Sequence, residues 1–355
     1  MKFEPALTNY NSNYRRYVVH HVPKVHHSST PKKMTEANLR NITASEETTS
    51  SADNRIRIIL DPQAGICGGV RRAIRFAEKE LKRESNRQVY VLGDIIHNER
   101  EVERLEAAGL KTLHVDELEQ WAEDEKAGDP RDVVLVRAHG EPPETFDQLK
   151  RLNVRTVNGT CPVVTRSQEL AQEYHQKGYQ IAIVGKHKHP EIVSIIGHTQ
   201  NHGIIIQFDE DTEKLNPDRP TLVMAQTTID PKQFGVMVAK ILQRVKEVEV
   251  SETICKFVIR RHLNLPRFAR NADVILVVGG HKSSNTKMLH ATCKAINPRC
   301  YHVVDVKEID RAWFDGARAI GVTGSASTPS WLLEEFVKAL EKWIEAGWPR
   351  VEASN

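Results

Sequence analysis

Three cysteines recur along the chain at equal intervals: Cys67, Cys161 and Cys255 are separated by 94 residues in each case. Each cysteine follows a strand-like run and precedes a helix-like run, as RIRIILDPQAGIC precedes GGVRRAIRFAEKEL. This equal spacing predicts three copies of one structural unit, each of which contributes one thiol to a shared centre. Three thiolates at one centre are typical of a metal or iron–sulfur site.

The length and charge of the chain narrow the class of protein. Its 355 residues suit two or three α/β units rather than one core. The net charge of +3, from 50 basic and 47 acidic residues, is too balanced to indicate nucleic-acid or membrane binding. No apolar run approaches the roughly 20 residues needed to span a bilayer. Five widely spaced cysteines indicate reduced thiols in a cytosol-like compartment rather than a disulfide framework.

Short apolar runs rich in β-branched residues alternate with amphipathic helix patterns through the body of the chain. Runs such as IRIIL, VYVLG and DVILVVGG are typical of buried parallel strands. The alternation predicts an α/β protein made of three small domains with pseudo-threefold symmetry. The expected domains are residues 55–150, 151–247 and 248–347, each with one of the three cysteines, followed by a C-terminal tail at 348–355.

Residues 1–54 differ in composition, since they are rich in Asn, Ser, Thr and His and lack periodic apolar residues. They are expected to form a disordered N-terminal tail. The alternative is an organelle transit peptide, because Glu4 is the only acid in the first 35 residues. Few arginines and no amphipathic helix pattern argue against it. A cytoplasmic location is therefore expected, with a plastid-type organelle as the alternative if the tail is a transit peptide.

Two polar turns follow each cysteine at repeating distances. The first turn comes 28 to 30 residues after the cysteine, at His97, His189 and Ser283–Ser284–Asn285. The second comes 66 to 72 residues after it, at His139, Thr227 and Ser327. Because parallel α/β sheets bind ligands beyond the carboxyl ends of their strands, we expect all six turns to face one cavity.

The positions of the cysteines favour thiolates, because the start of a helix supplies free N–H groups and a positive dipole end. Three thiolates leave a [4Fe–4S] cubane with one iron that lacks a protein ligand and can bind substrate. A structural zinc site would normally need four ligands, often in close C-x₂-C pairs, which this chain lacks. Cys293 and Cys300 have no counterparts in the other repeats and are expected to be packing or surface thiols.

The remaining polar residues suggest an anionic ligand. Histidine, hydroxyl and amide donors without a group of carboxylates suit a phosphate or diphosphate. The turn HKSSNTK also offers the N–H groups of a helix start, although a plain helix cap is the simpler interpretation of that turn alone. Glu191, two residues after His189, is an isolated carboxylate and thus a candidate proton donor. The alternative for Glu191 is a solvated surface acid.

Several segments together resemble the 4-hydroxy-3-methylbut-2-enyl diphosphate reductase family. They are AGICGGVRRAI, LGDIIHNERE, RAHGEPPE, TCPVVT, HPEI, AQTT, ETIC, KSSN and GSASTP, in that order from about residue 55 to 345. The resemblance implies a trefoil of three α/β domains around an oxygen-sensitive [4Fe–4S] cluster held by Cys67, Cys161 and Cys255. It implies diphosphate binding by His97, His139, His189, Ser283, Ser284, Asn285 and Ser327. Thr227 and Glu191 would position the substrate hydroxyl and deliver protons.

The activity implied by this resemblance is reductive dehydroxylation, the last step of the methylerythritol phosphate route to isoprenoids. The allylic diphosphate substrate would give isopentenyl and dimethylallyl diphosphate, with electrons from a ferredoxin or flavodoxin. The product ratio, the choice of donor and the oligomeric state stay open. The chain departs from the common family pattern at Asn158 and Gly159, where many relatives have Asp-Ala, and at His262, where glutamine is usual. These departures bear on substrate affinity and redox tuning rather than on the reaction class.

Two other classes of protein are alternatives to a reductase. A non-catalytic iron–sulfur or metal-sensing regulator could use the same three cysteines, but it would need neither Glu191 nor Thr227. A nucleic-acid-binding module is disfavoured by the near-neutral charge and by the lack of a basic stripe interleaved with aromatic residues.

Overall fold

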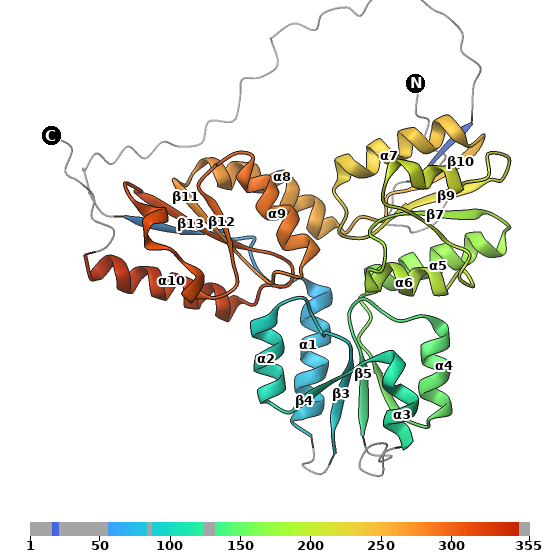
Figure 1. The fold of residues 1–355 in the computed structure, drawn as a ribbon, viewed down its shortest axis with the longest axis horizontal. Coiled ribbons are helices and arrows are strands. Elements are labelled where there is room, and N and C mark those ends of the chain that lie inside the picture. Colours follow the sequence, from blue (N-terminus) through green and yellow to red (C-terminus); the bar gives the residue numbers. More distant parts are fainter. Residues whose placement is uncertain (1–15, 21–55, 84–86, 124–131, 348–355) are drawn as a thin grey trace, which may run out of the picture.

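The computed structural model describes residues 16–20, 56–83, 87–123 and 132–347. The chain forms three α/β domains that meet at the centre of the molecule (Figure 1). Each domain contains a parallel sheet with helices on both faces, the arrangement expected for β-α repeats with buried strands. The predicted fold class, three small α/β domains in a trefoil, is confirmed.

The first domain has a four-stranded sheet with the order β4-β3-β5-β6. Its strands are β3 (Val89–Leu92), β4 (Leu110–Leu113), β5 (Val133–Val136) and β6 (Arg155–Asn158). Its helices are α1 (Gly68–Leu81), α2 (Glu99–Ala107), α3 (Leu118–Glu123) and α4 (Pro143–Arg151), with a 3₁₀ turn at Val115–Glu117.

The second domain has four parallel strands in the order β8-β7-β9-β10, and β1 (Arg16–His20) adds a fifth, antiparallel strand beside β10. Its strands are β7 (Gln180–Val184), β8 (Ile204–Ile206), β9 (Thr221–Ala225) and β10 (Glu247–Ser251). Its helices are α5 (Pro162–Gln176), α6 (Pro190–Gly197) and α7 (Pro231–Arg244), with a 3₁₀ segment at Asp209–Lys214.

The third domain has the order β12-β11-β13-β2. Its strands are β11 (Val274–Val278), β12 (Cys300–Val303), β13 (Ala319–Gly324) and β2 (Arg57–Leu60). Its helices are α8 (Lys256–Arg270), α9 (Ser284–Lys294) and α10 (Ser330–Glu345), with 3₁₀ turns at Val306–Glu308 and Arg311–Phe314.

The cysteines lie where the chain passes from one domain to the next. The strand before each cysteine completes one sheet, and the helix after it packs on the next sheet. The strand β2, which precedes Cys67, pairs with β13 near the other end of the chain and so closes the ring. The predicted boundaries at 55, 151 and 248 are therefore wrong by one strand each, for β2, β6 and β10. A strand pattern shows that a strand forms but does not identify its partner sheet.

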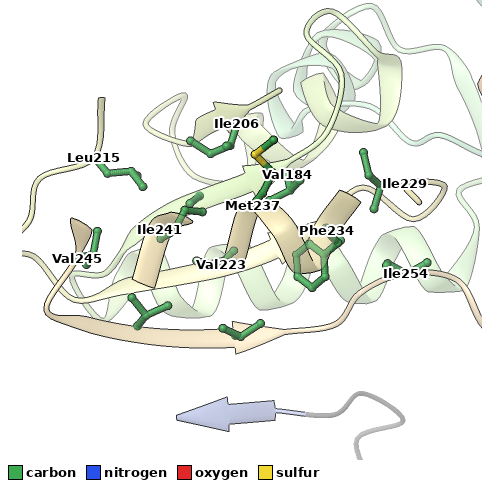
Figure 2. Close-up of a cluster of buried hydrophobic side chains, with 14 of the residues drawn as sticks. Val184, Ile206, Leu215, Val223, Ile229, Phe234, Met237, Ile241, Val245 and Ile254 are labelled. Atoms are coloured by element: carbon green, nitrogen blue, oxygen red, sulfur yellow. The ribbon is translucent and has the colours of Figure 1, made fainter. Parts of the chain in front are cut away.

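Alternation along the strands gives each sheet two apolar faces. In the first domain Val91 and Leu135 pack with α1 and α2, whereas Leu92 and Val136 pack with α3 and α4. Figure 2 shows one face of the second domain, where Phe234, Met237 and Ile241 of α7 lie over the sheet. Their spacing of three and four residues places them on one side of the helix. These cores fix the strand ends that carry the polar turns.

The N-terminal region differs from the prediction at β1 (Arg16–His20), which pairs antiparallel with β10. Without β1, β10 would be a sheet edge with unpaired backbone groups, and the β-branched run RYVVH suits pairing there. The rest of the predicted tail, residues 1–15 and 21–54, lies outside the described residues, as does 348–355. In the part of the chain that is described, no helix combines the length and apolar character needed to cross a bilayer.

Candidate functional site

Each of the three cysteines is the N-cap residue of a helix, as expected: Cys67 of α1, Cys161 of α5 and Cys255 of α8. The backbone N–H of each cysteine donates to a carbonyl in the second polar turn of a different repeat. These bonds join Cys67 to Ala326 (3.1 Å), Cys161 to Ala138 (3.0 Å) and Cys255 to Thr227 (2.9 Å). The threefold relation inferred from spacing is thus present in the hydrogen bonds that position the thiols.

One cavity of about 110 Å³ lies at the junction of the three domains. All twelve residues that the sequence singled out line it: Cys67, His97, His139, Cys161, His189, Glu191, Thr227, Cys255, Ser283, Ser284, Asn285 and Ser327. They come from positions as far apart as the first and last β-α units. The fold therefore brings together the whole predicted set.

The thiols lie close together in a partly desolvated setting. Burial raises the pKa of Cys67, with a smaller contribution from Cys161 and Cys255, while the N–H groups of Val70 and Gly69 lower it. Gly69 is needed for packing, since a methyl group there would collide with the Sγ atom of Cys161. Burial therefore opposes deprotonation of Cys67, and a bound cationic centre would favour its thiolate form.

Three histidines lie together in the lining of the cavity. The rings of His97 and His139 stack with centroids 4.8 Å apart, and His189 meets both edge-on at 5.9 and 5.4 Å. Burial, followed by His97 and by the cations Lys186 and Arg137, lowers the pKa of His189 to about 3. Burial also lowers the pKa of His97 and of His139, so all three rings are neutral at pH 7.

Neutral histidines can serve either an anion or a metal. The Nδ1 atom of His189 accepts from the backbone N–H of Glu191 at 3.2 Å, which leaves its Nε2–H free to donate. Among the three rings, one nitrogen from each lies within 4.8 Å of the others, so the group could also hold a metal ion. Arg137 and Lys186 lie near enough to lower the pKa of His189 by their charge. Cations around neutral donors favour an anionic ligand.

Several buried polar atoms around the cavity have no hydrogen-bond partner among the described residues. They are Nδ1 of His97, Nδ1 of His139, and both Oδ1 and Nδ2 of Asn285. An unsatisfied buried polar group costs about 1–3 kcal/mol, so such a group in a native site is typical of ligand contact. Their convergence from two domains indicates a polar ligand between them.

Glu191 and Thr227 form a buried pair on the cavity wall. The backbone N–H of Thr227 donates to Oε1 of Glu191 at 2.6 Å, and its hydroxyl donates to Oε2 at 2.7 Å. Burial raises the pKa of Glu191 to about 7, against the opposing effect of these two bonds. Glu191 is therefore not a solvated surface acid, the alternative considered from its sequence.

Hydrogen bonds between serine hydroxyl groups connect the two polar turns of the third domain. The hydroxyl of Ser283 caps α9 by accepting from Thr286 N–H at 3.2 Å, and Ser327 donates to Ser283 at 3.3 Å. Lys186 of the second domain donates to the hydroxyl of Ser284 at 3.0 Å. These bonds hold the turns of two domains around one wall of the cavity.

The sequence prediction missed Thr228, which also lines the cavity. The residue after the carbonyl that binds each cysteine is His139, Ser327 and Thr228 in the three repeats. Thr228 is thus the threefold equivalent of His139 and Ser327, whereas Thr227 is one position earlier. The interval of 67 residues from Cys161 to Thr228 would have pointed to it as well as the interval of 66 to Thr227.

The residues that depart from the common family pattern have structural roles. The side-chain oxygen of Asn158 accepts from Thr160 N–H at 2.9 Å and shapes the turn before Cys161. At Gly159 a Cβ atom would collide with the carbonyl oxygen of Val136. His262 does not line the cavity; its Nε2 atom lies 3.0 Å from Sδ of Met288. Asn158 therefore keeps the turn geometry without bringing a negative charge to it.

Fold and site together define a three-domain α/β protein with a central cavity lined by three thiols and by histidine, hydroxyl and amide groups. The chain belongs to the LytB protein family, whose pattern matches residues 58–341.

Proteins similar in sequence or structure to this chain share one enzyme name. A 4-hydroxy-3-methylbut-2-enyl diphosphate reductase of Bacteroides fragilis is 38% identical over 82% of this chain and 99% of that protein. An enzyme of the same name from Aquifex aeolicus is 35% identical over 82% of this chain and 98% of its own length. A solved structure of (E)-4-hydroxy-3-methyl-but-2-enyl diphosphate reductase, described as the terminal enzyme of the non-mevalonate pathway, matches with a TM-score of 0.61 and 33% identity. It covers 81% of this chain and 99% of that one.

Proposed function

We propose that this protein is a 4-hydroxy-3-methylbut-2-enyl diphosphate reductase that removes the allylic hydroxyl group of its substrate. The observation that carries this proposal is the single cavity lined by three thiols, three neutral histidines and a buried glutamic acid. The relatives named above supply the substrate. A metal sensor would have no use for the Glu191–Thr227 pair beside the thiols.

The donor set fits an iron–sulfur cluster. Three soft thiols come from three domains, each at a helix start, and they repel one another unless a cationic centre joins them. Cys67, Cys161 and Cys255 would hold a [4Fe–4S] cluster. When bound, it would supply single electrons and one Lewis-acidic iron that has no protein ligand.

The other residues bind and orient the substrate. His97, His139 and His189 would donate to the diphosphate as neutral N–H groups, together with the turn of Ser283–Ser284–Asn285 and with Ser327. Lys186 and Arg137 supply positive charge around them. Because the diphosphate group is held at one end of the substrate, the hydroxyl group at its other end would lie beside Thr227 and the thiols.

Glu191 would deliver the proton that leaves with the hydroxyl group, one of the two that the reaction consumes. The balance of the reaction is R–OH plus two electrons and two protons to R–H plus water. With a pKa of about 7, Glu191 is largely protonated below that pH and can protonate the departing hydroxyl group. Thr227 holds the carboxyl group in place through both of its oxygens. Electrons would come from a ferredoxin or flavodoxin.

The diphosphate assignment is tested by two variants, His139→Ala and Asn285→Ala. Each removes donors from the cavity and should weaken binding of substrate and of inorganic diphosphate by roughly 1.5–3 kcal/mol. Calorimetry under argon measures both, and His202→Ala, an exposed histidine, serves as the control. If the free alcohol bound as tightly as the diphosphate, the assignment would be wrong. A tight Zn²⁺ site that needs His139 and is indifferent to diphosphate would favour the metal interpretation.

A further inference from the structure

A groove of about 810 Å³ runs along the junction of the first and third domains, outside the central cavity. Its lining comes from helices α1, α2 and α8 and from the start of α10. Its lining includes Gly65 and Ile66, which lead directly to Cys67, and Phe257, two residues after Cys255. Phe257 also lines the central cavity, so the two hollows share this residue. The groove is thus a surface that reaches two of the three thiol-bearing segments.

The groove is strongly basic. Its lining contains exposed Arg71 and Arg75 of α1 and exposed Arg260 of α8. No carboxylate in the described part of the chain forms an ion pair with any of these three. The two acids that line the groove, Glu78 and Glu101, are already paired with a fourth arginine, Arg104, at 2.8 and 2.7 Å. Three arginines therefore face outward without a carboxylate partner among the described residues. With Arg261 balanced by Asp61, the lining as a whole carries a net charge of about +2, because Arg104 is shared by two acids.

One arginine links this charge to the thiol region. The Nη2 atom of Arg71 donates to the carbonyl oxygen of Ile66 at 3.2 Å, one residue before Cys67. Electron transfer slows steeply with distance, so a protein donor must dock close to the thiols without blocking the cavity that takes the substrate. The groove suits both conditions, because it lies outside the central cavity, shares Phe257 with it, and is lined by Gly65 and Ile66, which lead to Cys67.

We propose that this groove, defined by Arg71, Arg75, Arg104 and Arg260, is the docking surface for a small acidic one-electron carrier protein. The inference rests on the proposed reductase function. Each docking event oxidises one carrier and delivers one electron, so two events and two protons serve each substrate molecule. Redox encounters of this kind bury little area and are steered by opposite charge rather than held by large apolar contacts.

The test compares a protein donor with a small one. The double variant Arg75→Glu/Arg260→Glu is assayed anaerobically with reduced [2Fe–2S] ferredoxin and, separately, with reduced methyl viologen. Charge reversal should raise the KM for ferredoxin at least about 10-fold and abolish its dependence on ionic strength. Turnover with methyl viologen should stay the same, because a small donor needs no docking surface.

Matched variants isolate the charge at this place. Arg75→Lys/Arg260→Lys should behave like the unaltered protein, and so should Arg151→Glu, which reverses an exposed arginine on α4 away from the groove. An unchanged KM for ferredoxin in the double Glu variant would overturn the docking site, as would an equal loss with both donors. If the unaltered protein failed to turn over the substrate even with methyl viologen, the reductase function itself would fall.

Discussion

At the scale of single residues, the central feature is an acid whose pKa is raised by its surroundings. Glu191 is buried in α6 and touches Thr227 through both carboxyl oxygens. Burial outweighs these bonds and raises its pKa to about 7. Because this value exceeds the ordinary 4.5, folding is favoured by protonation at low pH, and this contribution is lost as the pH rises through about 7.

Replacing Glu191 by glutamine should separate proton delivery from substrate binding. The variant Glu191→Gln keeps the shape and the contacts with Thr227 but cannot release a proton, so turnover should fall at least ~100-fold. In the unaltered protein the rate should fall as the pH rises through about 7. Steady-state assays across pH 5.5–9 would measure both.

Two controls define this result. Glu191→Asp, which keeps the acid but displaces it by one methylene, should be intermediate. Near-normal turnover in Glu191→Gln would shift the role to another proton donor. A Gln variant that could not bind iron would instead show that Glu191 is structural.

Sequence patterns predicted most of the polar residues that line the cavity, but they did not predict which strands pair with one another. Equal cysteine spacing and the two sets of polar turns predicted the cavity, because strand ends of a parallel sheet meet at one edge. The partner of β2 could not be predicted, since its pairing with β13 joins segments from opposite ends of the chain. The displacement between Thr227 and Thr228 was also hidden, because spacing does not distinguish adjacent residues in a turn.

At the scale of elements, a buried ion pair joins two thiol-bearing segments. Arg261 of α8 contacts Asp61, which follows β2, at 2.5 Å, and also donates to the hydroxyl of Thr323 at 2.8 Å. Both charged side chains are almost completely buried. The pair fixes α8, which begins after Cys255, against the segment that leads to Cys67.

Breaking this pair should destabilise the third domain strongly. Arg261→Met leaves the Asp61 carboxylate buried without its cation, at a cost of about 3–5 kcal/mol in the free energy of unfolding. Anaerobic urea denaturation measures this cost. The double variant Asp61→Asn/Arg261→Met should recover much of the stability, because no charge is left uncompensated. A single variant that loses less than about 0.5 kcal/mol would show that the pair has no such role.

At the scale of the whole molecule, the chain closes on itself as a ring of three equal units. Each sheet is completed by the strand that precedes a cysteine, and β2 completes the third one. The strand β1 lies outside this ring, on the free side of β10. This ring explains why the three thiols meet. None of the strand pairs that close it involves a residue before β2.

Removal of residues 1–50 should therefore leave the ring intact. The deletion takes away β1, but β10 stays paired with β9 and its core side chains stay covered by α7. Iron content and turnover should match the full chain, and a melting curve should shift by only a few degrees. A loss of either iron or activity would show that the N-terminal region is part of the functional unit.

The most direct test of the account is the metal content of the protein after anaerobic purification. Three cysteines around one cavity predict a brown protein with iron and acid-labile sulfide in a ratio of about 4:4. Serine at Cys67, Cys161 or Cys255 should remove the iron, the sulfide and the activity, whereas serine at buried Cys293 or Cys300 should not. Stoichiometric zinc without sulfide would contradict the account.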